Sequence, residues 1–330
     1  MTYSLVTALM ALAVTLLGSS VFTNGIEWIG KKLKLSDGAV GSVLAGVGTA
    51  LPETLIPLIA ILFGHGLAEK EIGIGAILGA PFMLSTLTLP LVGFGVYFFA
   101  RTGKRTRQFH LNFKEIEIDL KYFLISFSLA VAASAIENRL THTIIGLFLF
   151  GLYANYLRDI FKRPSSDHLD LEPLYFQKFI RHPGVRTIVV QTLFGLGLIV
   201  GGAVYFIEGI AGIADFFHVS PFILSLLITP IATELPEKFN SLIWISKKKD
   251  HLAVSNITGA MVFQSTFPVS IGLFGTAWAF DRNGMTNIIL TFVTALFFFS
   301  LLLFKKKWEP YHLMLGTISY IAYVLILIFY

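Results

Sequence analysis

Residues Gly46–Ile59 read G-V-G-T-A-L-P-E-T-L-I-P-L-I, so a threonine, a proline and a glutamate stand inside an apolar run long enough to cross a membrane. An acidic side chain at that depth costs roughly 2.5–3.5 kcal/mol on insertion scales. Because Pro52 cannot donate a backbone hydrogen bond to the Gly48 carbonyl, we expect the helix to break beside Glu53. A second copy, Ala232–Glu237, reads A-T-E-L-P-E and repeats the arrangement. Two such costly arrangements in one chain indicate a membrane site for a cation.

The composition excludes an ordinary soluble domain. The 330-residue chain is 55% hydrophobic, has a mean hydropathy of +0.75 and is only 14% charged, whereas soluble domains have about 25% charged residues. Its apolar segments are long and continuous, which indicates transmembrane helices and not the alternating strands of a membrane barrel. Residues Tyr3–Val21 have neither a basic segment before them nor a cleavage pattern after them, so they are interpreted as the first span. The absence of cysteine excludes disulfides and thiolate metal sites.

The apolar pattern predicts ten transmembrane segments. They cover approximately residues 3–30, 37–63, 71–100, 119–136, 140–157, 187–215, 221–246, 252–280, 286–304 and 311–330. With the N-terminus outside, 21 of the 25 lysines and arginines fall in inward-facing connections, as the positive-inside rule requires. We therefore expect a multi-pass protein of the plasma (cytoplasmic) membrane with both termini outside. Its net charge of +5 is explained by this orientation, so no nucleic-acid partner is expected.

The chain contains an internal repeat. At an offset of 184 residues, positions 18–59 and 202–243 are identical at twelve of 42 sites. Five predicted spans separate corresponding elements, so the copies point in opposite directions, as in transporters with a midplane site. An old duplication kept only for packing is the simpler alternative, but the acids inside the matched stretch favour transport.

The repeat divides the chain into two halves joined by a linker. Residues 1–157 and 187–330 each hold five predicted helices, and 158–186 form a cytoplasmic linker. Within the linker, residues 174–182 are rich in aromatic and basic side chains. An interfacial helix and a plain connection are equally compatible with that composition.

The two motifs offer the oxygen ligands that a hard cation requires. Calcium takes six to eight oxygens from carboxylates, carbonyls, hydroxyls and water. The candidate ligands are the carboxylates of Glu53 and Glu237, the hydroxyls of Thr49 and Thr233, and the carbonyls of Gly48 and Ala232, which the prolines leave without a donor. Two uncharged glutamates hydrogen-bonded between helices are the alternative, because burial favours the neutral carboxyl. The symmetry of the two acids favours the cation site.

These residues resemble a known family. Phe22–Glu53, with F-T-N-G-I-E-W-I-G-K-K-L-K-L-S and then G-T-A-L-P-E, resembles the first alpha repeat of the sodium/calcium exchanger family, within the cation/calcium antiporter superfamily. Phe206–Glu237 is similar to the second repeat, and the similarity covers about residues 18–100 and 202–280. The resemblance implies an all-α integral membrane protein of ten helices in two inverted five-helix repeats, with helices 2 and 7 broken at the Pro-Glu motifs.

The resemblance also implies a transport site. Carried onto this chain, Glu53 and Glu237 are the central ligands of the transported calcium, and Thr49 and Thr233 contribute further oxygens. Extracellular sodium or protons would provide the drive. No resident cofactor is expected, because the cations are substrates.

The chain departs from the family pattern at several ligand positions. The family motif G-T-S-L-P-E has a serine where this chain has Ala50 in one copy and Glu234 in the other. On the third and eighth helices, alanines replace serines, and a leucine and a glutamine replace the Asn/Asp pair; these residues are Ala80, Ala260, Leu84 and Gln264. Gln264 stays a candidate ligand. The missing oxygens favour proton coupling, an altered stoichiometry or another divalent ion such as Mn²⁺ or Mg²⁺.

Glu234 has no counterpart in the first copy. On a helix it shares a face with Glu237 at i+3 and with Lys238 at i+4. Glu234 could be a third carboxylate of the site, or Glu234 and Lys238 could form an ion pair whose ammonium substitutes for a lost sodium ion. Alternatively, both side chains could be solvated in a cytoplasmic vestibule. Because the break at Pro236 makes helical periodicity unreliable, the sequence leaves all three open.

The sequence therefore predicts a secondary cation antiporter and not an enzyme. No Ser/His pair or His-metal set accompanies the acids, as a hydrolase would need. The expected partners are a divalent cation, a counter-ion and the lipid bilayer, whereas the oligomeric state stays open. An uncoupled cation pathway and a scaffold protein that no longer transports are the alternatives.

Overall fold

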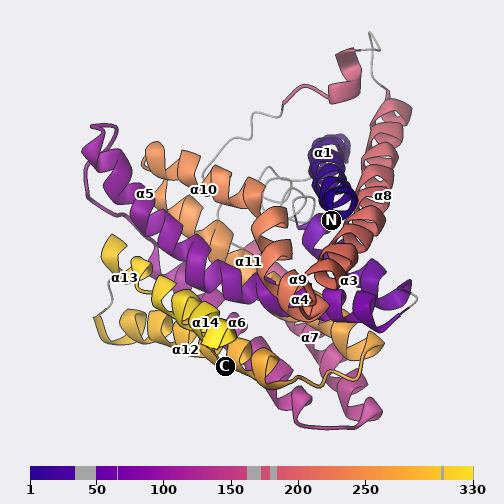
Figure 1. Cartoon of the computed structure of the whole chain (residues 1–330). Coiled ribbons are helices and arrows are strands. Elements are labelled where there is room, and N and C mark those ends of the chain that lie inside the picture. Colours follow the sequence, from indigo (N-terminus) through magenta and orange to yellow (C-terminus); the bar gives the residue numbers. More distant parts are fainter. Residues whose placement is uncertain (34–49, 65, 162–171, 179–183, 306–307, 330) are drawn as a thin grey trace. The chain divides into compact units, whose positions relative to one another are not determined.

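Over the residues that the structure describes, the protein is entirely helical (Figure 1). This computed structural model describes residues 1–33, 50–64, 66–161, 172–178, 184–305 and 308–329. Its helices are α1 (Thr2–Lys32), α3 (Leu51–Leu62), α4 (Leu67–Met83), the π-helix η2 (Leu84–Thr88), α5 (Leu89–Arg101), α6 (Phe113–Ser134), α7 (Arg139–Phe161), the 3₁₀-helix η3 (Tyr175–Lys178), α8 (Val185–Phe217), α9 (Pro221–Thr233), α10 (Leu235–Ser246), α11 (Asp250–Gly275), α12 (Arg282–Lys305), α13 (Pro310–Met314) and α14 (Thr317–Phe329). Each of the ten predicted apolar segments overlaps at least one of these helices.

The helices have the length and surface of membrane spans. Within the described ranges, seven helical stretches are long and apolar enough to cross a membrane. Large apolar side chains such as Leu9, Leu193 and Phe304 are exposed on them, as a lipid solvent permits. A helix also satisfies its backbone polar groups internally, which the bilayer core demands. The prediction of an all-α integral membrane protein is confirmed, whereas the count of ten spans stays a prediction.

Two compact units divide the chain. One consists of Met1–Gly73 and Ala154–Leu224, and the other of Ile74–Tyr153 and Ser225–Tyr330. Helices α4, α7 and α9 each begin in one unit and end in the other. The division of the sequence into repeat halves at the linker is a different partition, and it stays a prediction.

In the first unit, α1 and α8 lie side by side (Figure 1). Their close approach depends on glycines that face the partner backbone. A Cβ atom added at Gly202 would overlap the Thr15 hydroxyl and lie 2.9 Å from the Ala11 carbonyl oxygen. A Cβ atom at Gly209 would lie 2.7 Å from the Ala8 amide nitrogen. Small residues of this kind let membrane helices pack backbone to backbone. Helix α3 packs against both members of this pair.

The end of the linker is anchored to the same helix pair. The Tyr175 amide donates to Asn24 Oδ1 at 3.1 Å, and the Phe176 amide donates to Gln191 Oε1 at 2.8 Å. Gln191 also donates to Asn24 Oδ1 at 2.9 Å, so the two buried amides bridge α1 and α8. The described residues of the predicted interfacial helix form only the single turn η3, and 179–182 lie outside the described residues. Burial, and then the neighbouring Glu172 carboxylate, raise the pKa of Tyr175.

In the second unit, α5 packs against α10 and α13, and α6 packs against α11 and α12. The π-turn η2 stands before Pro90, which has no N–H to donate, and the Leu89 amide bonds to the Leu84 carbonyl five residues back. Gly79 of α4 lies directly against α9. A Cβ atom there would overlap the Leu226 carbonyl oxygen and lie 2.8 Å from Pro230 Cγ. This contact holds the end of α9 close to α4.

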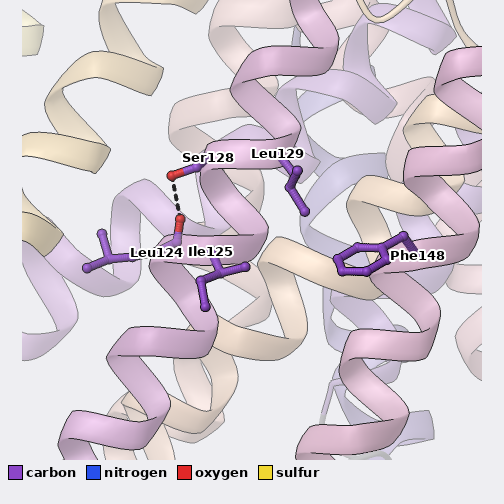
Figure 2. Close-up of a pocket in the computed structure, with 5 residues that line it drawn as sticks. All are labelled: Leu124, Ile125, Ser128, Leu129 and Phe148. Atoms are coloured by element: carbon purple, nitrogen blue, oxygen red, sulfur yellow. Dashed lines mark hydrogen bonds between the residues drawn. The ribbon is translucent and has the colours of Figure 1, made fainter.

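An open apolar hollow lies between α6 and α7 in the second unit. Figure 2 shows its lining, which consists of Leu124, Ile125, Ser128, Leu129 and Phe148. The hydroxyl of Ser128 donates to the Leu124 carbonyl at 2.6 Å, so it offers no free proton to the hollow. With a volume of about 460 Å³ and no charged lining, this hollow suits lipid tails and not a cation.

A buried ion pair fastens the loop after α5 to the start of α11. The Arg105 guanidinium contacts both carboxylate oxygens of Asp250, at 2.5 and 2.9 Å. It also donates to the carbonyls of Thr106, Gln108 and Ile245. The side chains of Arg105 and Asp250 are almost completely buried, so each charge depends on its partner.

We expect Gly202→Leu to destabilise the α1–α8 pair by about 1–3 kcal/mol, because the new side chain must displace the α1 backbone. The neighbouring Gly201 is exposed and has no atom near its added Cβ, so Gly201→Leu is the matched control. Thermal unfolding of the purified protein in detergent measures both. Equal melting temperatures for the two variants would contradict the packing described here.

We expect Arg105→Met to destabilise the second unit by about 3–5 kcal/mol, because it leaves the Asp250 carboxylate buried without its guanidinium. Arg101→Met, which removes an exposed charge from the same region, is the control. The double variant Arg105→Met/Asp250→Leu should recover much of the lost melting temperature, since it removes both charges. No recovery would show that packing of the arginine side chain, and not charge pairing, stabilises the loop.

Candidate functional site

The first Pro-Glu motif forms the N-terminus of α3. Ala50 precedes the helix, and Pro52 lies in its first turn, where no backbone N–H is needed. Glu53 follows in the same turn and is only 5% exposed. The positive end of the helix dipole favours a carboxylate at this place. The predicted ligands Gly48 and Thr49 lie outside the described residues.

The second motif joins two helices. Helix α9 ends at Thr233, Glu234 stands between the helices, and α10 begins at Leu235 with a proline in its first turn. Ala232 and Thr233 are buried at the end of α9. Glu237 lies in the first turn of α10, and its side chain is outside the described part of the structure.

Hydroxyl groups form a row along α9 that ends at the second motif. Ser225, Thr229 and Thr233 recur every four residues and are all buried. The Ser225 and Thr229 hydroxyl oxygens lie 2.9 Å apart, and the Thr233 hydroxyl donates to the Thr229 carbonyl at 3.0 Å. The Thr233 oxygen therefore keeps its lone pairs for a ligand. Ser225 and Thr229 were not predicted from the sequence, although their spacing of four residues puts them on the same helix face as Thr233.

Glu234 and Lys238 form a buried ion pair. Lys238 Nζ lies 3.4 Å from Glu234 Oε2, and the two side chains are 12% and 2% exposed. The same ammonium donates to the Pro230 carbonyl oxygen at 3.2 Å. This is the geometry expected from the ion-pair interpretation, and the low exposure argues against a solvated vestibule.

Gln264 lies in the middle of α11 and is 3% exposed. Its Oε1 atom has no hydrogen-bond partner among the described residues. A buried acceptor without a partner costs about 1–3 kcal/mol, which a bound cation or water would offset. The positions of the missing family oxygens are apolar: Ala80 and Leu84 are buried on α4 and η2.

A second polar seam lies between α6 and α11. The buried carboxylate of Asp119 accepts a hydrogen bond from the Thr258 hydroxyl at 2.6 Å, and the Ser126 and Ser265 hydroxyl oxygens lie 2.6 Å apart. This seam was not predicted from the sequence, because the residues of each pair are 139 positions apart in the chain. Within the described ranges, no three His, Cys, Asp or Glu side chains are grouped closely enough to hold a metal ion.

Comparisons with known proteins agree on the family. The sequence model of the family described as "Sodium/calcium exchanger protein" matches residues 3–160 and 187–330. The inner membrane protein YrbG of Escherichia coli (strain K12) is 22% identical over 277 residues, which cover 82% of this chain and 79% of that protein.

Solved structures share the fold. The crystal structure of the H⁺/Ca²⁺ exchanger CAX matches with a TM-score of 0.72 at 18% identity, over 99% of this chain and 82% of that one. A structure of the sodium-calcium exchanger NCX_Mj, soaked with Na⁺ and Sr²⁺, matches with a TM-score of 0.59 at 19% identity, over 98% of this chain and 97% of that one. The resemblance recognised in the sequence is confirmed, and the chain belongs to the sodium/calcium exchanger protein family of membrane antiporters.

Proposed function

We propose that the chain is a secondary active antiporter that extrudes Ca²⁺ in exchange for Na⁺ or H⁺ by alternating access. The observation that carries this proposal is the buried Glu53, which follows a proline at the start of an apolar helix and recurs in sequence as Glu237. Membership in a family of cation/calcium antiporters supports the same activity. The membrane is the plasma (cytoplasmic) membrane, with both termini outside.

The architecture that goes with this function is ten helices in two inverted five-helix repeats, with helices 2 and 7 broken at the Pro-Glu motifs. Two element boundaries support it. Helix α3 begins at the first motif, and the α9–α10 junction falls at Glu234 in the second. The distribution of basic residues supports the opposite orientation of the two repeats.

The carboxylates of Glu53 and Glu237 are the central cation ligands in this proposal. Thr49 and Thr233 add hydroxyl oxygens, Gly48 and Ala232 add carbonyl oxygens, and Glu234 and Gln264 complete the candidate set. The buried Thr233 hydroxyl oxygen and the unpartnered Gln264 Oε1 support it, because both are neutral oxygens of the kind that hard cations bind. No resident cofactor takes part.

Coupling follows from the cost of a bare carboxylate in a low-dielectric site. Two carboxylates in one membrane site would be neutralised by one divalent cation or by two monovalent cations, and an empty site would be strongly disfavoured. The free-energy barrier to reorientation of the repeats is therefore low only when cations are bound. Movement in one direction then carries calcium, and movement in the other direction carries the counter-ion.

An H⁺-coupled antiporter for another divalent cation, Mn²⁺ or Mg²⁺, is the second candidate. The buried Ala80 and Leu84 favour it, because they remove oxygens where the family pattern has ligands. An uncoupled cation pathway is the third candidate. Flux in proteoliposomes, with each divalent cation tested against imposed sodium and pH gradients, separates the three, since uncoupled flux ignores both gradients.

We expect Glu53→Gln and Glu237→Gln each to reduce Ca²⁺ flux in proteoliposomes at least about tenfold. The reason is that removing a charged ligand should weaken the binding free energy of Ca²⁺ by more than ~1.4 kcal/mol, which corresponds to a factor of ten. Glu71→Gln removes an exposed acid from the start of α4 and is the matched control. Wild-type flux in both motif variants would refute the proposed ligands.

We expect Gln264→Leu to weaken the apparent affinity for Ca²⁺ without lowering the melting temperature. The substitution removes a buried acceptor that has no partner among the described residues, so folding loses no hydrogen bond from that atom. The measurements are the concentration dependence of flux and thermal unfolding in detergent. Unchanged affinity with a lower melting temperature would assign Gln264 a structural role instead.

A further inference from the structure

The Lys238 side chain occupies a place with the chemistry of a cation site. Its ammonium lies between a carboxylate oxygen of Glu234, at 3.4 Å, and the Pro230 carbonyl oxygen, at 3.2 Å. Both oxygens belong to the segment where α9 ends and α10 begins, and the pair is nearly excluded from solvent. A carboxylate and a backbone carbonyl are the oxygens that coordinate monovalent cations at interrupted membrane helices.

The first motif shows how the same two positions look without this pair. At the repeat offset of 184, Ala50 corresponds to Glu234 and Thr54 corresponds to Lys238. The Thr54 hydroxyl donates to the Ala50 backbone carbonyl at 2.8 Å, so positions i and i+4 are joined there by a neutral side-chain-to-backbone hydrogen bond. The second motif has therefore gained one negative and one positive charge together, and each motif keeps one net formal negative charge.

We propose that the Lys238 ammonium is a tethered cation that permanently fills a monovalent-cation position beside Glu234, so that Glu234 adds no transported charge. The inference rests on the proposed antiport function and deepens it. The Lys238 ammonium is covalently attached to the chain, so it cannot leave with the transported ions. Because it takes the place of one mobile cation, it lowers the number of counter-ions moved per calcium. Lys238 is thus a specificity-determining residue of the second motif.

The test is the charge moved per Ca²⁺, obtained from the reversal potential of calcium flux in proteoliposomes clamped with K⁺ and valinomycin. In Lys238→Met, Glu234 is left without its ammonium, and a mobile monovalent cation is expected to take its place. The charge carried by counter-ions per calcium should then rise by one. Lys247→Met, which removes an exposed lysine at the end of α10, should leave that charge at the wild-type value.

A double variant provides the matched comparison. Glu234→Ala/Lys238→Thr copies the Ala50 and Thr54 pair of the first motif and restores the net charge. The double variant should move the same charge per calcium as wild type, even if its transport rate differs. The inference is overturned if Lys238→Met moves the wild-type charge, or if the double variant shows the altered value.

Thermal unfolding covers the case in which Lys238→Met does not transport. A vacated monovalent site predicts that NaCl, compared with choline chloride at equal ionic strength, raises the melting temperature of Lys238→Met more than that of wild type. Equal shifts would overturn the inference. Failure of the proposed antiport function would give a different result, namely normal flux in Glu53→Gln and Glu237→Gln. The sodium-specific rise in melting temperature of Lys238→Met would still be observed in that case.

Discussion

A carboxylate inside an apolar helix bundle needs a positive partner, and most of the distinctive chemistry of this chain follows from that constraint. The chain meets it in different ways. Asp250 receives the bidentate guanidinium of Arg105, which closes a loop and gives a permanent structural pair. Glu234 receives the ammonium of Lys238 from one turn further along. Glu53 lies in the first turn of α3, where the positive end of the helix dipole favours its carboxylate.

Packing around the end of α9 supplies hydrogen-bond partners for backbone groups beside the second motif. Glycine at position 79 lets α9 approach α4 closely at Leu226 and Pro230. The Pro230 carbonyl accepts from the Glu234 amide as well as from the Lys238 ammonium. An interrupted helix is tolerated in a membrane only where such neighbours satisfy the freed groups. A separate requirement, close approach of two helix backbones, explains the glycines along the α1–α8 contact.

Patterns that are local in the sequence predicted the all-helical fold class, whereas the ligand roles of the acids stay a prediction. Apolar length predicted the helices. The predicted helix break beside Glu53 stays a prediction, because Gly48 and Thr49 lie outside the described residues, and the structure gives only the start of α3 at Leu51. Contacts between distant segments could not be predicted in this way. Arg105 and Asp250 are 145 residues apart, and nothing in either segment marks the pair. Gly201 and Gly202 are adjacent glycines that the sequence does not distinguish, but a Cβ atom at Gly202 would overlap α1 and one at Gly201 would meet no atom.

The pair Glu234–Lys238 lies between these two cases. The i, i+4 spacing of the pair is present in the sequence. However, Pro236 interrupts the helical pattern, so the sequence alone did not establish that positions 234 and 238 share a helix face. In the structure, the i, i+4 relation survives because the Lys238 amide still bonds to the Glu234 carbonyl at 3.0 Å across the start of α10. The first motif keeps the corresponding Thr54–Ala50 contact. A duplicated motif can therefore exchange a neutral contact for an ion pair without changing its backbone or its net charge.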